Sequence, residues 1–382
     1  MDGMHAMDEP RELALVFVGG GSGGHLHPGL AVAERARERF PAFHALFLHS
    51  GLEVERRVLA TSDFPEETLP ITKPSGGARA WIRYSLQSFA AVRALRGRLK
   101  KGGFDAVVGL GGYASFPGVL AARRAGLPVV LLEQNEVPGR VNRFLSRFVE
   151  AVSCPSAASA SRLEGRAEVT GNPVRLSVLE AAAHRRVDRA AGEKRRVLVF
   201  GGSQGARGLN AALRRALDGL EDLRERIAWD HVTGEADRES LEEYYRSRGW
   251  EARVSSYSVD LPRRMAGSDM VICRAGGTSV AELTVVGVPS LLVPYPHHGD
   301  QHQLKNARAL EAAGGCRVLP QEEIRPETLR QALDDVLFST EKLGAMATSC
   351  RGLARPDAAD AVINLLIEVK RSCRLDSVSS SS

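Results

Sequence analysis

The chain of 382 residues carries two successive series of short apolar runs, and stretches with helical spacing separate the runs within each series. Apolar runs that are joined by helices and buried on both faces are typical of parallel sheets built from βαβ units. The strands that we predict are Leu13–Val18, Ala45–Leu48, Ala106–Leu110 and Val129–Leu132 in the first series, and Val197–Phe200, Ala228–Val232, Met270–Cys273 and Ser290–Val293 in the second. The pattern predicts an α/β protein whose two Rossmann-like, parallel-sheet domains face a central cleft.

A chain of this length is long for one hydrophobic core and sufficient for two. We place the N-terminal domain at 1–173 and the C-terminal domain at 174–356, because alanine and serine are dense before this boundary and a charged stretch follows it. A helix predicted over about 357–375 is expected to pack back on the first domain. The serine-rich end, 376–382, is expected to be disordered.

The formal net charge of +5 suits nucleic acid, an anionic membrane or a phosphorylated substrate, and it does not choose among them. The five cysteines include no C-x-x-C pair, which predicts reduced thiols and no zinc site. No apolar run reaches the roughly 18 residues of a membrane span, and the apolar stretch near the N-terminus is too short for a signal peptide. We therefore expect a cytosolic protein whose membrane contact, if it has one, is peripheral.

The first glycine-rich turn, GGGSGGH at Gly19–His25, follows an expected strand and precedes an expected helix, Pro28–Phe40. Its G-x-G-x-x-G spacing lets the backbone approach a phosphate at a helix N-terminus. A dinucleotide site also needs an acidic residue at the end of the next strand, and His49–Ser50 stand there, which argues against NAD. A tight turn without a ligand remains the alternative.

The second glycine-rich turn, Gly201–Ala206, repeats this arrangement at the start of the second domain. It lacks the lysine of a P-loop, so ATP or GTP hydrolysis has no support. Ser203 could donate to a diphosphate or cap the following helix, and Arg175 could bind the same diphosphate or lie in solvent. His25, at the end of the first turn, is either a general base, since imidazole accepts a proton near neutral pH, or a structural histidine.

Two later segments suit a nucleotide sugar. The turn AGGTS at Ala275–Ser279 opens a helix, and Glu282 could either bind a ribose diol there or act as a favourable charge near the helix N-terminus. The segment HHGDQHQLKN, His297–Asn306, offers donors and acceptors for sugar hydroxyls. A metal site is the lesser alternative in this segment, since no familiar ligand spacing is present. The side chains that could gather an ion are His298, Asp300 and His302.

Residues 71–101 hold eight basic residues and no acidic one. Their apolar members near helical spacing are Trp81, Ile82, Leu86, Phe89 and Leu99. The pattern fits a core-facing helix with a solvated basic face, or a surface that docks on anionic lipid through aromatic and arginine side chains. Both interpretations can hold for different parts of the segment.

Several motifs occur in one order between Gly19 and Asn306 and together resemble the MurG family of GT-B-fold glycosyltransferases. The matching stretches are GGGSGGHLHPGLAVAERA, GLGGYASFPGVLAA, LEQNEVPGRVNR, GNPVR, GGSQGARGLN, CRAGGTSVAEL and GDQHQLKNA. The resemblance implies an inverting hexosyltransferase of peptidoglycan synthesis. Its substrates would be UDP-N-acetylglucosamine and lipid I, the lipid-linked muramyl-pentapeptide, whose 4-hydroxyl receives the sugar to give lipid II.

The resemblance also implies a set of donor-binding residues, which are Ser22, Gly23, Gly24, Asn135, Arg175, Ser203, Ser258, Gly277, Thr278, Ser279, Val280, Ala281, Glu282 and Gln303. In this set Glu282 would hold the ribose and Gln303 the sugar. Ser203 and Arg175 would face the diphosphate, and His25 would be the base on the acceptor side. No Asp-x-Asp is present, so no metal or other cofactor is required, although a divalent cation would be compatible.

By the same resemblance, the partners are the two substrates and, through 71–101, the anionic surface of the bacterial inner membrane at its cytoplasmic face. Other cell-wall synthesis proteins are candidate partners, and nucleic acid is not expected. Two alternatives stay open. One is another GT-B enzyme, such as a diacylglycerol glucosyltransferase or a UDP-sugar 2-epimerase. The other is a UDP-sugar-binding subunit without activity of its own, for which one domain or a degraded first glycine turn would be expected.

Overall fold

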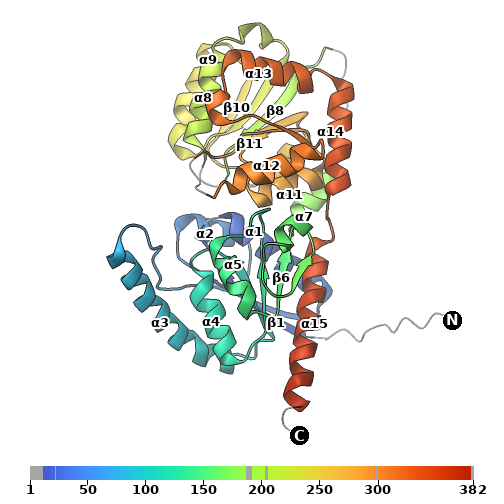
Figure 1. Cartoon of the computed structure of the whole chain (residues 1–382). Helices are drawn as coiled ribbons and strands as arrows, with labels where there is room; N and C mark the ends of the chain where they lie inside the picture. The colour runs from blue at the N-terminus through green and yellow to red at the C-terminus, as the bar shows by residue number, and fades with distance from the viewer. Residues whose placement is uncertain (1–11, 22, 186–191, 203–204, 297–299, 380–382) are drawn as a thin grey trace, which may run out of the picture.

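The computed structural model describes residues 12–21, 23–185, 192–202, 205–296 and 300–379, and its two α/β domains lie one above the other (Figure 1). The lower, N-terminal domain has a parallel sheet in the order β3-β2-β1-β4-β5-β6-β7. Its strands are β1 (Glu12–Gly19), β2 (Ala42–His49), β3 (Glu66–Thr68), β4 (Ala106–Gly111), β5 (Val129–Leu132), β6 (Ala151–Cys154) and β7 (Ala167–Val169). Its helices are α1 (Gly23–Arg39), α2 (Glu53–Leu59), α3 (Ala78–Lys101), α4 (Ser115–Ala125), α5 (Arg140–Leu145) and α6 (Ala157–Ala160).

The C-terminal domain repeats this plan with a parallel sheet in the order β10-β9-β8-β11-β12-β13. Its strands are β8 (Arg195–Phe200), β9 (Ile227–Val232), β10 (Ala252–Ser255), β11 (Met270–Cys273), β12 (Ser290–Leu292) and β13 (Cys316–Val318). The remaining helices are α7 (Leu176–Ala183), α8 (Arg207–Leu217), α9 (Arg238–Ser247), α10 (Leu261–Ala266), α11 (Gly277–Val286), α12 (His302–Ala312), α13 (Pro326–Ala332), α14 (Thr340–Leu353) and α15 (Ala358–Ser379). The prediction of two Rossmann-like parallel sheets is confirmed, and every predicted strand is present.

The chain crosses between the domains twice. After β7 it reaches α7, which packs against α10 and α11 of the C-terminal domain, so the boundary placed at 173/174 falls in this first crossing. After α14 it returns to the N-terminal domain as α15, which packs on α1 and adds Val362, Ile363 and Leu366 to the core under the first sheet (Figure 1). The helix α15 runs on to Ser379, which is four residues into the tail that we expected to be disordered.

One buried polar network lies under the second sheet. The His231 side chain is fully buried on β9, with Nδ1 3.1 Å from the Tyr245 hydroxyl and Nε2 3.1 Å from Asn210 Oδ1. The Asn210 amide nitrogen donates to the Thr233 carbonyl and to Asp237, so its oxygen faces the imidazole. The His231 Nε2 therefore carries the proton and Nδ1 accepts from Tyr245, an arrangement that satisfies the neutral ring completely.

Acid is expected to destabilise the fold through this histidine. Burial lowers the pKa of His231 to about 3, whereas the unfolded chain titrates near the ordinary value of 6.5. Between those two values the unfolded state binds one more proton, so the free energy of unfolding falls by up to about 1.4 kcal/mol per unit of pH. Urea midpoints measured from pH 8 to pH 5 should drop less in His231→Gln than in the unchanged protein. Equal losses in the two proteins would contradict this account.

Candidate active site

A cleft of about 820 Å³ separates the two domains and is lined by both of them. The glycine-rich turns after β1, β8 and β11 border it, so it lies at the carboxyl ends of the strands, where α/β sheets bind ligands. The helices α1, α8 and α11 begin beside these turns and direct free backbone N–H groups toward the cleft. The arrangement suits an anionic ligand such as a diphosphate.

The glycine-rich turn after β1 touches a second one in the same domain, GGYAS at Gly111–Ser115, which follows β4. The backbone N–H of Gly20 donates to the Gly111 carbonyl at 3.2 Å. Gly112 has a φ of 74°, and a Cβ at this position would lie 1.8 Å from the Gly20 carbonyl oxygen. Only glycine fits there, because it allows both the left-handed backbone and the close approach. The fold therefore joins the first turn and the GGYAS turn into one surface.

A buried carboxylate holds the first glycine turn from behind. Glu55 accepts from the backbone N–H groups of Gly21 at 2.5 Å and Leu52 at 2.9 Å, from the Ser50 hydroxyl, and lies 3.3 Å from His49. Burial acts to raise the pKa of Glu55, but these hydrogen bonds outweigh it and keep the pKa below its ordinary value. Glu55 is thus an anchor of the turn, and it was not among the predicted site residues.

His25 stands in the first turn of α1 and lines the cleft. Its ring lies against the backbone of Gly111, because a Cβ there would be 3.2 Å from His25 Cδ2. Burial lowers the pKa of His25 to about 4, the charge of Glu55 opposes this shift, and His302 across the cleft adds to it. The imidazole is therefore neutral at physiological pH, which is the form that a general base needs.

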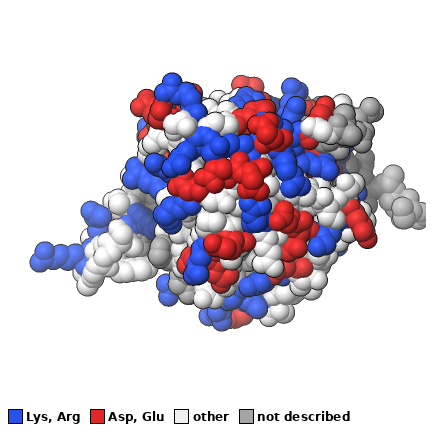
Figure 2. All heavy atoms as spheres, turned by 90° about the horizontal axis from the view of Figure 1, so that it is seen from above, with Lys and Arg blue, Asp and Glu red and all other residues white. Residues whose placement is uncertain are grey.

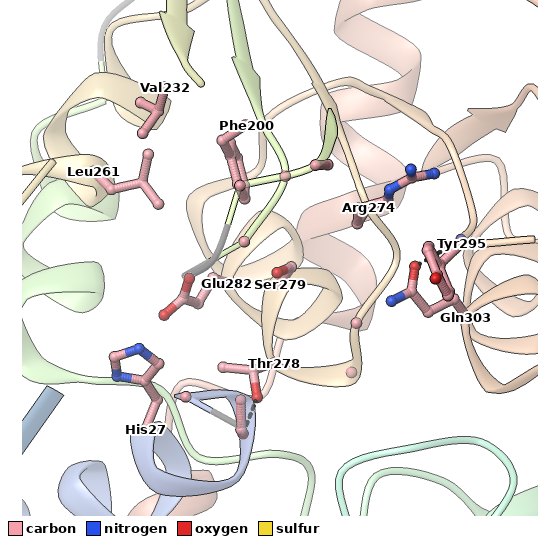
Figure 3. Close-up of a pocket in the computed structure, with 18 of the residues that line it drawn as sticks. His27, Phe200, Val232, Leu261, Arg274, Thr278, Ser279, Glu282, Tyr295 and Gln303 are labelled. Atoms are coloured by element: carbon pink, nitrogen blue, oxygen red, sulfur yellow. Dashed lines mark hydrogen bonds between the residues drawn. The ribbon is translucent and has the colours of Figure 1, made fainter. Parts of the chain in front are cut away.

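An ion pair occupies the floor of the cleft. Arg175 Nη2 donates to Glu282 Oε1 at 2.9 Å, and Glu282 is only 5% exposed. Figure 3 shows the Glu282 carboxylate between the wall of the C-terminal domain and His27, which points up toward it from α1. Burial and the charge of Arg175 lower the pKa of His27 to about 3. This second imidazole was not among the predicted site residues, and the spacing of the first turn gave no signal for it.

A further group of side chains lies on the other side of the cleft, away from His27 (Figure 3). Gln303 Oε1 accepts from the backbone N–H of Tyr295 at 2.9 Å, which fixes its amide. Arg274 is buried and donates to the carbonyls of Val293 and Pro294 at 3.1 Å each. Neither Arg274 nor Tyr295 was predicted, although both line the cleft.

Most of the predicted donor-binding residues line the cleft, namely Gly23, Gly24, Asn135, Arg175, Ser258, Gly277, Thr278, Ser279, Glu282 and Gln303. Val280 and Ala281 border a smaller cavity instead, which adjoins the cleft at Gln134 and Gly277. Ser22 and Ser203 lie outside the described residues, and so does His298 of the metal alternative. Within the described part of the chain no three metal-binding side chains gather; His302 Nε2 contacts Asp300 Oδ2 at 2.5 Å.

A proline in α1 frees one backbone group for a contact between the domains. Pro28 has no N–H, so the carbonyl of Gly24, four residues earlier, loses its usual partner within the helix. The Thr278 hydroxyl of the other domain donates to this carbonyl at 2.8 Å. Pro28 thus leaves α1 continuous but frees one carbonyl, which accepts a hydrogen bond from the other domain at the cleft.

Both halves of the chain match models of one enzyme family. Residues 15–154 match the glycosyltransferase family 28 N-terminal domain, and residues 196–362 match the glycosyltransferase family 28 C-terminal domain. The chain belongs to glycosyltransferase family 28. The resemblance to MurG glycosyltransferases drawn from the motifs is therefore confirmed at the level of the family, and the cleft lies between the two family 28 domains.

The relatives of this family 28 chain match it over nearly their whole length. A protein of Anaeromyxobacter sp. (strain K) is 38% identical over 362 residues, 94% of each chain, and one of Nitratidesulfovibrio vulgaris is 40% identical over 361 residues, 93% of this chain and 97% of the relative. Both are named UDP-N-acetylglucosamine--N-acetylmuramyl-(pentapeptide) pyrophosphoryl-undecaprenol N-acetylglucosamine transferase.

Solved structures share the architecture. The crystal structure of Acinetobacter baumannii MurG is similar with a TM-score of 0.73 and 28% identity, over 93% of this chain and 99% of that one. A UDP-GlcNAc 2-epimerase from Neisseria meningitidis has a TM-score of 0.63 at 14% identity, over 94% of this chain and 100% of that one. The second likeness shows the shared fold alone.

Proposed function

We propose that this family 28 enzyme transfers N-acetylglucosamine from UDP-N-acetylglucosamine to the 4-hydroxyl of lipid-linked muramyl-pentapeptide, with inversion at the anomeric carbon. The observation that carries the proposal is the likeness, across both domains, to relatives named for this reaction. The cleft adds support, because it combines three helix N-termini with neutral imidazoles and a partly buried ion pair.

The UDP of the donor binds to the C-terminal wall of the cleft. Glu282 accepts hydrogen bonds from the ribose diol, for which it must release or share Oε1, the oxygen that now accepts from Arg175. The freed guanidinium then turns to the diphosphate, where the N-termini of α8 and α11 also lie. Binding therefore exchanges an internal ion pair for one with the ligand. Gln303 and Asn135 contact the sugar from opposite domains.

The acceptor approaches over the joined glycine turns of the N-terminal domain. His25 takes the proton of the attacking 4-hydroxyl while the new C–O bond forms and the bond from the anomeric carbon to UDP breaks. The phosphate oxygen of UDP keeps the electron pair of the broken bond and so gains a negative charge, which the helix N-termini and Arg175 stabilise in the transition state. No metal enters this scheme.

A transfer assay tests the proposal. Radiolabelled N-acetylglucosamine is offered as UDP-N-acetylglucosamine with a short-chain lipid I analogue, and UDP-glucose and diacylglycerol serve as donor and acceptor controls. Labelling that depends on lipid I is expected. Labelling of diacylglycerol alone, or formation of UDP-N-acetylmannosamine from donor alone, would overturn the proposal and assign another GT-B reaction. No transfer to any acceptor would favour a binding subunit.

We also propose that α3 docks on the anionic cytoplasmic surface of the inner membrane. No helix of the described residues is long and apolar enough to cross a bilayer. On α3, however, Trp81, Ile82, Leu86 and Phe89 are 55% to 73% exposed, and the helix ends on three basic residues. The opposite end of the molecule, formed by the C-terminal domain, shows basic and acidic side chains interspersed (Figure 2). Exposed aromatics beside arginines favour an interfacial surface at α3.

Charge placed on α3 should release the enzyme from lipid. Leu86→Glu with Phe89→Glu removes two apolar anchors and adds repulsion from anionic headgroups, so affinity for phosphatidylglycerol vesicles should fall by about tenfold or more. The matched control is Leu375→Glu, which changes another exposed leucine, 72% exposed, on α15. Vesicle flotation measures both, and equal binding by the α3 variant and the control would contradict the docking surface.

A further inference from the structure

The buried side-chain amide of Asn306 forms hydrogen bonds with both domains, next to Asn135 of the cleft. Asn306 lies on α12, one turn after His302, and is 3% exposed. Its Oδ1 accepts from the backbone N–H of Glu136 in the N-terminal domain at 2.9 Å. Its Nδ2 donates to the Ala275 carbonyl of its own domain and to Asn135 Oδ1 across the boundary, both at 3.0 Å. Three hydrogen bonds thus converge on one side chain, and two of them cross between domains.

These contacts fix which way the Asn306 amide points. The Glu136 N–H can only donate, and the Ala275 carbonyl can only accept, so the oxygen and nitrogen of Asn306 cannot exchange places. The nitrogen must therefore face Asn135. Because that nitrogen is a donor only, the atom of Asn135 that meets it must be the acceptor Oδ1.

The other end of the Asn135 amide is fixed in the same way. Asn135 Nδ2 donates to Glu133 Oε1 at 3.1 Å. Glu133 is 2% exposed and also accepts from the backbone N–H groups of Gln134, Asn135 and Gly139, so its carboxylate is held rigidly. Asn135 lines the cleft and, after these two bonds, keeps one N–H and one oxygen lone pair for a ligand.

We propose that Asn306 is a positioning residue for the donor sugar, acting through Asn135. Together with Glu133, it holds the Asn135 amide in one orientation, so that a sugar hydroxyl meets a donor and an acceptor in a set order. Because Asn306 belongs to the C-terminal domain and Asn135 to the N-terminal domain, the sugar contact is complete only when the domains are in this arrangement. The inference rests on the proposed donor, UDP-N-acetylglucosamine.

The test compares ligands with and without the sugar. Asn306→Asp keeps an acceptor for the Glu136 N–H but cannot donate to Asn135 Oδ1 or the Ala275 carbonyl. Affinity for UDP-N-acetylglucosamine, measured by calorimetry, and kcat/KM for transfer should each fall about tenfold or more, while affinity for UDP, which lacks the sugar, should change less than about threefold. Retained UDP binding also shows that the variant is folded.

A double-mutant cycle separates positioning from packing. Asn135→Ala alone should weaken UDP-N-acetylglucosamine binding, and adding Asn306→Asp should cost little more, because Asn306 acts through Asn135. Additive losses would overturn the inference, as would a parallel loss of UDP affinity. The control is Asn210→Asp, which changes another amide in the same domain that is 3% exposed and remote from the sugar. It should lower stability while leaving the ratio of the affinities for UDP-N-acetylglucosamine and UDP unchanged. If the unchanged protein binds UDP, but the sugar of UDP-N-acetylglucosamine adds nothing to its affinity, the proposed donor is wrong, and this result does not test the role of Asn306.

Discussion

Replacing His25 by glutamine is expected to lower kcat for sugar transfer by about two to four orders of magnitude, which is the usual contribution of a positioned general base. Glutamine keeps a polar group of similar length but cannot take the proton of the attacking hydroxyl. His25 lies against the acceptor-side turns and not beside the Arg175–Glu282 pair. Affinity for UDP should therefore stay close to that of the unchanged enzyme, and calorimetry with UDP measures this directly.

The pH profile gives an independent reading of the same residue. A histidine at its ordinary pKa of 6.5 would lose half its basic form at that pH, but burial lowers the pKa of His25 to about 4. The neutral base is then present down to about pH 5, so kcat/KM should show no loss between pH 8 and pH 5.5 from this group. An acid limb near pH 6.5 that disappears in His25→Gln would contradict a neutral His25 imidazole.

His27 is the competing candidate, since it is also neutral and lines the cleft. It lies close enough to Arg175 for that charge to lower its pKa, and Figure 3 shows its ring facing Glu282. His27→Gln should therefore alter donor binding more than kcat. A loss of kcat confined to His27→Gln, with His25→Gln near the unchanged enzyme, would transfer the role of base to His27.

The central strands could be predicted from sequence because burial on both faces demands continuous apolar runs, as in β5 and β11. Most of the missed strands lie at sheet edges. β3, with the sequence EET, β7, with AEV, and β13, with CRV, are three residues long and end their sheets. At an edge one side of the strand needs no partner and its side chains can be polar, so no apolar run marks it. Pairing with a neighbour, which is a tertiary property, defines these strands.

The residues of the candidate site also fall into two groups, those that could be predicted from the sequence and those that could not. Glycine turns and Glu282 stand out in the sequence because their position after a strand already implies a phosphate or ribose contact. The residues that hold these groups in place do not stand out in the sequence. Glu55 reaches the first turn from a separate helix, and Asn306 meets Asn135 from 171 positions away in the other domain. Hydrogen bonds across such separations follow from packing, and no local spacing records them.

Glu282 provides the second large effect, on donor affinity. Glu282→Gln is expected to weaken UDP binding by roughly ten- to a hundredfold, because hydrogen bonds to a charged group contribute about 1.5 to 3 kcal/mol. Glutamine is preferred to alanine for this test. Alanine would leave the partly buried Arg175 guanidinium without an acceptor, whereas the glutamine amide oxygen can still accept from it. Removing one partner of a fully buried ion pair costs about 3 to 5 kcal/mol of stability, which is an upper bound for this pair.

A ligand lacking one hydroxyl makes the test specific to the ribose. The unchanged enzyme should bind 2′-deoxy-UDP more weakly than UDP, because Glu282 then accepts one hydrogen bond fewer, and Glu282→Gln should reduce this preference to about twofold or less. The control is Glu34→Gln, which removes another carboxylate whose charge reaches Arg175 without lining the cleft. It should keep the preference for UDP. If Glu282→Gln discriminates between the two nucleotides as strongly as the unchanged enzyme, Glu282 does not hold the ribose, and its pair with Arg175 is structural.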